Sequence, residues 1–237
     1  MKSQYARAYK HEQIKPLLEN VYWVHGSIKM APAMYMNRNM VIIKEENMLY
    51  LINPIRLNEK EEQKLKMMGK VVAILRLGDF HGVDDQYYVD KFGCEFWCQK
   101  NQTSYPLPVA DHCIASGVKP PIKNAEFFIF STALYPESAL LLKDKKLLIT
   151  TDSIQYWTDW QHMSVLGKIV LWVMGFRRGL FIGKPWLRRV TPKGGSLKED
   201  FDSLLALDFN HLIAAHGKPL FHDARQNVKS LINTTFR

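Results

Sequence analysis

Acidic and imidazole side chains stand at the ends of several apolar runs of this chain. They fall in four short segments, at 79–85, 135–138, 151–153 and 215–219. Residues at the ends of neighbouring strands can converge on one cleft, where carboxylate oxygen and imidazole nitrogen hold Zn²⁺, Fe or Mn. Such a metal makes its water acidic enough to attack an ester, thioester, amide or phosphoester near neutral pH. The pattern therefore predicts metal-assisted hydrolytic chemistry.

The order of these segments resembles that of the metallo-β-lactamase superfamily. In that superfamily an H-x-H-x-D-H loop follows an early strand, a later loop supplies another His, and two further loops supply a bridging Asp and a last His. Laid over this chain, the first motif falls on Asp79, His81, Val83 and Asp84, so that one of its three histidines remains. The position of the later His is occupied by Leu134.

The bridging Asp matches Asp152, and the last His matches His216. The resemblance covers the chain from about Val21 to the C-terminus. It implies an α+β fold, a four-layer αββα sandwich like that of the metallo-β-lactamases, with an altered metal site.

The resemblance further implies a site for one divalent metal (Zn, Fe or Mn). Its ligands would be two histidines and two carboxylates: His81, Asp84, Asp152 and His216. Asp79 would orient water or act as a base, so that Asp79 and Asp152 are the expected catalytic residues. A second metal is not expected, because Val83 and Leu134 place hydrocarbon where it would need ligands.

A purely structural interpretation of the same residues stays open. Asp79 or Asp84 would cap the helix that follows, and Asp152 would accept hydrogen bonds from backbone N–H groups. His216 would then bond to one of the acids. Glu137 stands beside the vacant third-His position, and we expect it to point a carboxylate into the cleft.

The segment 168–198 is rich in cations and aromatic rings. It holds eight basic residues and no acid, with Trp172, Phe176, Phe181 and Trp186 between them. Together with the formal net charge of +9, this predicts an affinity for phosphate or for an anionic membrane surface. We assign Arg177 and Trp186, with Glu137, to substrate binding. The alternative is a solvated basic face whose aromatic rings turn to the core.

Composition favours one domain over residues 1–237, because no Pro/Gly/Ser-rich stretch separates two halves. Three cysteines, none of them in a C-x-x-C pair, fit a reducing compartment. The first seven residues lead into charged positions without an apolar core, so a cleaved secretion signal is not expected. We therefore predict a cytoplasmic protein. The apolar stretch 165–183 is interrupted by Lys168, Arg177 and Arg178 and is too short to span a bilayer.

Local patterns predict the elements that must position these residues. Strands are expected at 21–24, 40–43, 48–52, 71–75, 94–98, 127–131, 139–142, 147–150 and 212–215. Helices are expected at 59–68, 84–91, 157–182, 198–207 and 223–232. Asn58 would cap the first of these helices, and 143–146 would be a hairpin turn.

Two functions follow from these observations. The first is a mononuclear metal-dependent hydrolase of a small, anionic, ester-type substrate. The second is a catalytically inactive protein that contacts an anionic membrane surface or a partner through its basic and aromatic segment. Nucleic acid is not expected as a partner, because the nuclease branch of the superfamily relies on two metals.

Overall fold

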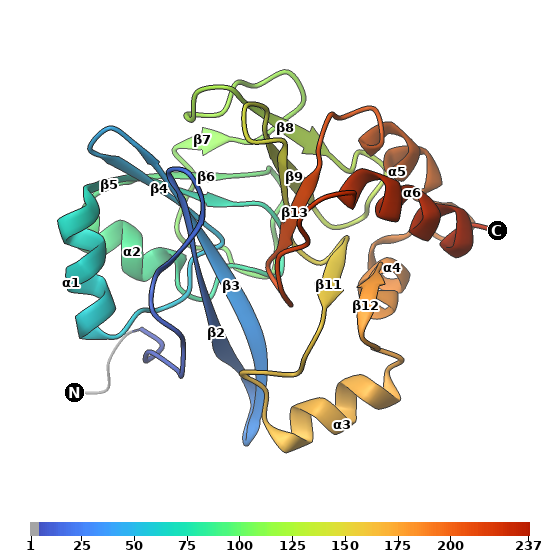
Figure 1. Cartoon of the computed structure of the whole chain (residues 1–237), viewed down its shortest axis with the longest axis horizontal. Helices are drawn as coiled ribbons and strands as arrows, with labels where there is room; N and C mark the ends of the chain where they lie inside the picture. Colours follow the sequence, from blue (N-terminus) through green and yellow to red (C-terminus); the bar gives the residue numbers. More distant parts are fainter. Residues whose placement is uncertain (1–4) are drawn as a thin grey trace.

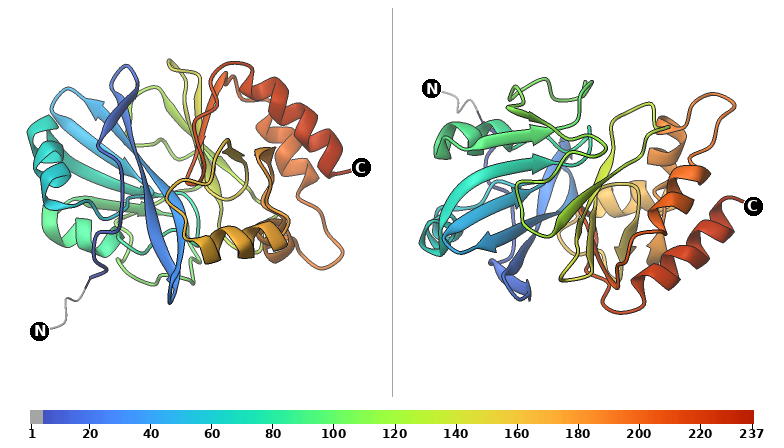
Figure 2. Two further views of the ribbon diagram at one scale, coloured as in Figure 1. Left: turned by 60° about the horizontal axis from the view of Figure 1, so that its bottom comes forward. Right: turned by 90° about the horizontal axis from the view of Figure 1, so that it is seen from above.

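Two β-sheets face each other in the computed structural model, which describes residues 5–237. The argument about a secretion signal rests in part on residues 1–4, which lie outside the described residues. Figure 2 shows helices on the outer face of each sheet, so that the layers run helix, sheet, sheet, helix. This is the four-layer α+β arrangement that the sequence predicts.

The first sheet contains seven strands in sequence order. Its first four strands are antiparallel, and the strands from β4 to β7 run parallel. The strands are β1 (Lys15–Leu18), β2 (Val21–Ala31), β3 (Met34–Glu45), β4 (Met48–Ile52), β5 (Lys70–Arg76), β6 (Glu95–Cys98) and β7 (His112–Cys113). The β2–β3 hairpin is longer than predicted, and its tip lies next to α3 (Val165–Val173) in Figure 1.

The second sheet has four strands in the order β13, β10, β9, β8. They are β8 (Ala125–Ile129), β9 (Ser138–Leu142), β10 (Leu147–Thr150) and β13 (His211–Ala214). The last strand joins β10 in parallel, opposite Leu147–Thr150 in register. A separate pair, β11 (Gln155–Trp157) and β12 (Gly179–Phe181), lies beyond the end of this sheet.

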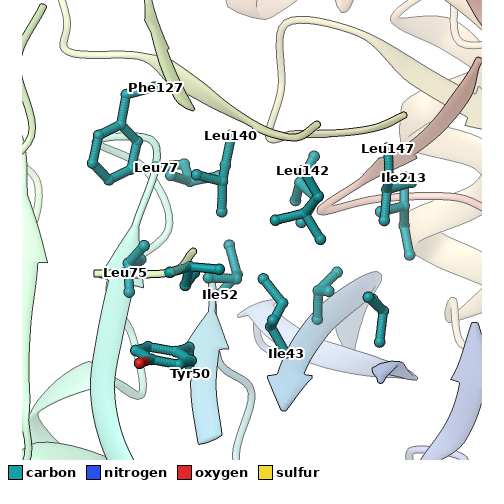
Figure 3. Packing of buried hydrophobic residues seen from close by; sticks show 14 of the residues in the cluster. Ile43, Tyr50, Ile52, Leu75, Leu77, Phe127, Leu140, Leu142, Leu147 and Ile213 are labelled. Atoms are coloured by element: carbon teal, nitrogen blue, oxygen red, sulfur yellow. The ribbon is translucent and has the colours of Figure 1, made fainter. Parts of the chain in front are cut away.

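Apolar side chains of both sheets fill the space between them, as Figure 3 shows. Ile43, Ile52 and Leu75 from the first sheet meet Leu140 and Leu147 from the second. All five are buried, so the two sheets are held together mainly by the removal of apolar surface from water.

The outer faces of the sheets are covered by helices. α1 (Glu59–Met68) and α2 (Asp85–Phe92) pack on the first sheet, through Leu65 and Tyr88. α4 (Lys184–Val190), α5 (Lys198–Leu204) and α6 (Ala224–Thr235) pack on the second, through Trp186, Phe201 and Val228. The capping prediction for α1 is confirmed, because the Asn58 side chain accepts a hydrogen bond from the Glu61 N–H.

The predicted helix over 157–182 is wrong in extent. Only α3 is helical there, and β11 and β12 occupy the two ends of the range. The Ser164 side chain caps the start of α3 by accepting from the Gly167 N–H. Gly175 has φ +89°, a conformation in which glycine ends helices without the strain that other residues suffer.

No helix in the described range 5–237 has the length and apolar character needed to cross a membrane.

Candidate metal centre

Three side chains from distant parts of the chain meet at one point. His81, Asp152 and His216 each offer a ligand atom, and these atoms lie within 4.8 Å of one another. The Nε2 atoms of His81 and His216 are 3.2 Å apart, and the Nε2 of His216 lies 3.3 Å from an oxygen of Asp152. The structure therefore brings together three of the four residues that the sequence suggests as ligands.

Strand ends place these three side chains. His81 follows β5 in the first sheet, whereas Asp152 and His216 follow β10 and β13 in the second. Thr150 pairs with Ala214 in the parallel register, so Asp152 and His216 each stand two residues beyond the last paired position. Because β10 and β13 are parallel neighbours, the residues that follow them lie at the same edge of the sheet.

Three consecutive polar residues in the middle of β3 support the centre. The Asn37 carbonyl lies 2.6 Å from Nδ1 of His216, and the Arg38 guanidinium donates to the His81 carbonyl at 2.9 Å. The Asn39 amide donates to the carbonyls of Ala214 and Gly217. All three β3 residues are buried.

Sequence reasoning missed these supporting residues. A signal was present, because a polar run between Met36 and Met40 interrupts a strand that is otherwise apolar. Buried polar residues need partners, and here the partners are the loops that carry the ligands.

The contacts of His216 fix which of its nitrogens faces the cluster. A backbone carbonyl can only accept, so Nδ1 of His216 must donate its proton to Asn37. Nε2 of His216 therefore faces the Asp152 oxygen and His81. At 3.2 Å the two Nε2 atoms suit either an N–H···N hydrogen bond, with the proton on His81, or a metal ion bound to both rings.

The residues present fit a metal ion. Two nitrogen or oxygen ligands bound at about 2.0–2.1 Å in a tetrahedral arrangement lie roughly 3.4 Å apart, close to the separations seen here. In addition, Nδ1 of His81 is buried, lies 3.7 Å from an oxygen of Asp152, and has no hydrogen-bond partner among residues 5–237. Two imidazoles and one carboxylate are a donor set that suits Zn²⁺, Fe or Mn.

The electrostatics favour the protonation states that bind metal. Burial, and then the Arg38 cation, hold the pKa of His81 well below its usual value, which keeps the ring neutral. Burial alone would raise the pKa of Asp152, but the cation of Arg38 and the hydrogen-bonding imidazoles around the carboxylate outweigh burial and lower the pKa well below its usual value. A neutral imidazole and an ionised carboxylate are the forms that coordinate cations.

Asp79 does not have the position expected of a base. Its buried carboxylate accepts hydrogen bonds from the Thr103 N–H at 2.7 Å and from the N–H and hydroxyl of Ser104. These bonds fasten the loop after β6, and that loop places Ser104 and Tyr105 in the wall of the cavity described below. The expected role in orienting water therefore finds no support in the geometry.

Asp84 does not join the cluster either, although it was expected as the fourth ligand. One of its oxygens accepts from the Arg56 N–H at 2.9 Å, and the other is buried and has no hydrogen-bond partner within residues 5–237. Its side chain makes no capping bond to α2. Burial raises the pKa of Asp84 to about 6.

Glu137, which was expected to point into the cleft, bonds to the loop of Asp152 and is not part of the cavity wall described below. Its carboxylate accepts from the Thr151 hydroxyl and from the N–H groups of Asp152 and Ser153. Burial, and then the charge of Asp152, raise the pKa of Glu137 to about 8. Glu137 therefore holds the backbone of the loop that presents Asp152.

The three ligand residues stand in the wall of a cavity of about 530 Å³. Its other walls are mainly apolar, with four methionines among them: Met30, Met34, Met36 and Met174. Trp186 lines it, as the sequence suggests, but Arg177 does not, because its guanidinium donates to the carbonyls of Trp172 and Phe176. The cationic side chains in the wall include Arg38 and Arg189 instead.

Arg38 is the polar group of most interest in this wall. Only 2% of its surface is exposed, and its Nε has no hydrogen-bond partner in the described part of the chain. A buried guanidinium with unused donors is costly unless an anion completes its contacts. Sequence reasoning did not find Arg38.

Comparison with known proteins identifies the fold. No protein-family profile matches the chain, and no curated protein matches it. Among solved structures, VMB-1 at pH 5.5 is similar with a TM-score of 0.70 and 9% identity, over 97% of this chain and 100% of the other. The mono-zinc form of the metallo-β-lactamase FIM-1 from Pseudomonas aeruginosa has a TM-score of 0.67 and 9% identity, over 97% of each chain.

A metallo-β-lactamase from Pontibacter korlensis is similar with a TM-score of 0.65 and 11% identity, over 94% of this chain and 99% of the other. The chain has the metallo-β-lactamase fold. The fold class expected from the order of motifs is confirmed.

Proposed function

We propose that this protein is a metal-dependent hydrolase with a mononuclear centre of His81, Asp152 and His216. Its substrate is a small ester-type molecule with an anionic group. The metal is Zn, Fe or Mn. The proposal differs from the sequence-based expectation in its ligand set, because Asp84 is replaced by an open position in a three-ligand site.

One observation carries the proposal. Nε2 of His216 faces both the Asp152 carboxylate and Nε2 of His81, and all three residues border a cavity. Three protein ligands with an open position are typical of catalytic sites, whereas structural sites close their coordination shell with four.

The chain's own residues supply binding and orientation. Arg38 stands in the cavity wall, where its positive charge attracts a carboxylate or phosphate of the substrate, and the apolar wall near Phe80 and Trp186 excludes water around the reacting bond. When bound, a divalent cation supplies an acidic water and polarises the carbonyl of the ester. Glu137 and Asn37 hold the loops of Asp152 and His216 in place.

Metal content tests this proposal. Protein purified without added metal, then titrated with Zn²⁺, Fe²⁺ or Mn²⁺, should bind one ion per chain by elemental analysis and calorimetry. The variants His81→Ala, Asp152→Ala and His216→Ala should each bind at least roughly tenfold more weakly. Asp84→Asn and Asp79→Asn are matched controls in the same loop, and both should bind like the wild type.

Two results would count against the metal site. The first is a stoichiometry near zero with all three metals. The second is a loss of binding in Asp84→Asn as large as that in Asp152→Ala, which would return Asp84 to the ligand set.

A catalytically inactive binding protein is the second candidate. The exposed apolar residues of α3 beside Lys168, Arg177 and Arg178 favour it, because such a surface suits a membrane or a partner. If this candidate is right, Asp152→Ala and His216→Ala leave the cellular role intact. Charge reversal at Arg177, Arg178 and Arg188 then abolishes it, whereas a hydrolase keeps its role with these reversals and loses it in Asp152→Ala and His216→Ala.

A further inference from the structure

Helix α3 exposes an apolar surface of a kind that proteins normally bury. We call this surface the α3 ridge, and it consists of Val165, Leu166, Ile169, Trp172 and Val173. Val165, Trp172 and Val173 are 73%, 59% and 72% exposed. Adjacent apolar residues with such exposure mark a site of contact with a protein or a membrane.

The ridge is exposed although α3 is packed against the rest of the protein through its other side. Gly167 and Leu171, on the opposite side of α3, are buried. A Cβ atom on Gly167 would lie 2.5 Å from the Tyr35 carbonyl, so α3 packs directly on the backbone of β3. Figure 1 shows α3 at the edge of the molecule, beside the tip of the β2–β3 hairpin.

Cations surround the ridge. Lys168, Arg177 and Arg178 are exposed, and the Arg177 guanidinium lies 4.9 Å from the centre of the Trp172 ring. The sequence has no acid between Asp159 and Glu199. An apolar groove of about 730 Å³ runs beside the ridge between Trp160 and Trp172, with Lys168 and Arg178 in its wall.

This chemistry matches the surface of an anionic bilayer. Aliphatic side chains and Trp enter the boundary between headgroups and acyl chains, while Lys and Arg reach the lipid phosphates. A second copy of the chain fits less well, because identical ridges would bring like charges together on proteins that each carry a net charge of +9.

The ridge is also next to the mouth of the metal-site cavity. Val170, Leu171 and Met174 of the α3 segment line that cavity from its inner side. Met174, and Met30 on the β2–β3 hairpin, line the cavity but are 45% and 52% exposed, so both form part of its rim. A molecule held in a bilayer under the ridge therefore has a short apolar route to the metal ligands.

We propose that the α3 ridge docks onto an anionic lipid bilayer and that the cavity behind it takes an acyl-chain ester from that bilayer. The choice of an ester rests on the proposed function. The docking does not, because it needs neither the metal nor catalysis.

Flotation with vesicles tests the docking. The full chain should float with vesicles that contain about 30% phosphatidylserine in phosphatidylcholine, and less with phosphatidylcholine alone. The triple variant Ile169→Gln, Trp172→Gln, Val173→Gln should lose roughly tenfold or more of its partition onto the mixed vesicles. The matched control is Met67→Gln, Val109→Gln, which removes exposed apolar residues elsewhere on the surface.

The charge contribution is tested with Lys168→Glu, Arg178→Glu against Lys229→Glu on α6. The first variant should lose most of its binding to the mixed vesicles, and the second should bind like the wild type. Near-ultraviolet circular dichroism of each variant separates unfolding from a loss of contact.

Three results would overturn the proposal. One is no partition of wild-type protein onto either vesicle. Another is equal losses in the ridge variant and the control. The third is a dimer of the wild type in sedimentation that is absent in the ridge variant, together with no binding of the wild type to vesicles. This result would assign the ridge to contact with a second copy of the chain.

A second measurement addresses the cavity without relying on turnover. A fluorescent long-chain fatty acid should bind the metal-free protein, and Arg38→Met should weaken this binding by roughly tenfold through loss of the carboxylate contact. Wild-type affinity for a short-chain analogue equal to that for the long chain would refute the acyl-chain part. If docking and acyl binding hold while no ester is cleaved, the hydrolase proposal fails and this one stands.

Discussion

The carboxylate of Glu137 holds the backbone that presents Asp152. It accepts hydrogen bonds from the N–H groups of both Asp152 and Ser153 and from the Thr151 hydroxyl. Gly78 makes room for it, since a Cβ atom there would lie 2.5 Å from a Glu137 oxygen. The side chain acts on the site through another residue and is therefore a positioning residue.

Glu137→Ala should destabilise the protein by roughly 3 kcal/mol, because two buried N–H groups lose their acceptor. Glu137→Gln keeps an oxygen in the same place and should cost less than about 1 kcal/mol. Urea unfolding at pH 7 measures both changes. The alanine variant should also bind Zn²⁺ at least roughly tenfold more weakly, and equal stability of the two variants would contradict the role assigned to this carboxylate.

Asp84 gives a prediction about pH. Its pKa rises from 3.8 to about 6 on burial, so the folded protein holds this proton more tightly than the unfolded chain does. Ionisation of Asp84 therefore costs stability as pH rises from about 4 to 6, and the cost remains in full above pH 6. A shift of this size corresponds to about 3 kcal/mol as an upper value.

Asp84→Asn removes this cost and keeps an oxygen acceptor for the Arg56 N–H. The variant should match the wild type near pH 4 and exceed it by roughly 1–3 kcal/mol at pH 7 in urea unfolding. Asp208→Asn, which removes an exposed carboxylate paired with Lys146, should change stability by less than about 1 kcal/mol at either pH. A constant difference between Asp84→Asn and the wild type from pH 4 to 7 would show that Asp84 is ionised in both states.

The motifs predicted the cluster only in part, for a physical reason. His81, Asp152 and His216 follow strands whose apolar runs are visible in the sequence, and strand order carries them to one place. Asp79 and Asp84 lie in the same loop as His81, but contacts with remote segments decide where they point. The Ser104 loop and the Arg56 backbone supply those contacts, and no local pattern reveals either.

At the scale of elements, the approach of β11 to the loop after β13 sets the position of His216. Tyr156 forms a bridge with Gly217, the residue after His216. Gly217 has φ +82°, and a Cβ atom on it would lie 2.2 Å from the Tyr156 carbonyl oxygen. Both the backbone conformation and the close approach require glycine here.

Gly217→Ala should therefore destabilise the protein by more than the strain of a positive φ alone. Gly117 is a matched control, since its φ is +77° and nothing lies within 4 Å of its Cβ position. Gly117→Ala should cost about 1 kcal/mol, and Gly217→Ala roughly 2 kcal/mol more, with weaker Zn²⁺ binding as β11 moves away. Equal costs in thermal unfolding would show that the contact with β11 is not tight.

Elements with clear end signals were predicted well, and those that depend on tertiary contacts were not. Helix α1 has the predicted limits because Asn58 satisfies an N–H of its first turn. Over 157–182 the apolar pattern suggested one helix, but apolar residues at the two ends of this range are equally compatible with strands. These ends form strands because Gln155–Trp157 pairs with Gly179–Phe181. The paired residues are more than 20 positions apart, so a local sequence pattern does not reveal the pairing.

At the scale of the whole molecule, the candidate metal centre joins the two sheets. His81 lies in the loop that follows β5 of the seven-stranded sheet, and Asp152 and His216 lie in loops that follow β10 and β13 of the four-stranded one. Between the sheets lies the apolar core of Figure 3, while at this edge polar contacts of β3 reach the loops of both sheets. A cation bound by all three residues would therefore add a link between two layers that otherwise meet through hydrocarbon.

Metal binding should consequently stabilise the fold as a whole. A ligand that binds only the folded state adds about 2.7 kcal/mol at a free concentration of 100 times its Kd. Zn²⁺ should shift the unfolding midpoint in one cooperative transition, and a chelator should reverse the shift.

Hydrogen exchange should then slow at the same time in the loop of His81 and in the loops of Asp152 and His216. His81→Ala should reduce the shift, because Asp152 and His216 alone bind the metal at least roughly tenfold more weakly. If that variant kept the full shift, or if protection rose only in the second sheet, the metal would be held within one sheet and His81 would have to leave the ligand set.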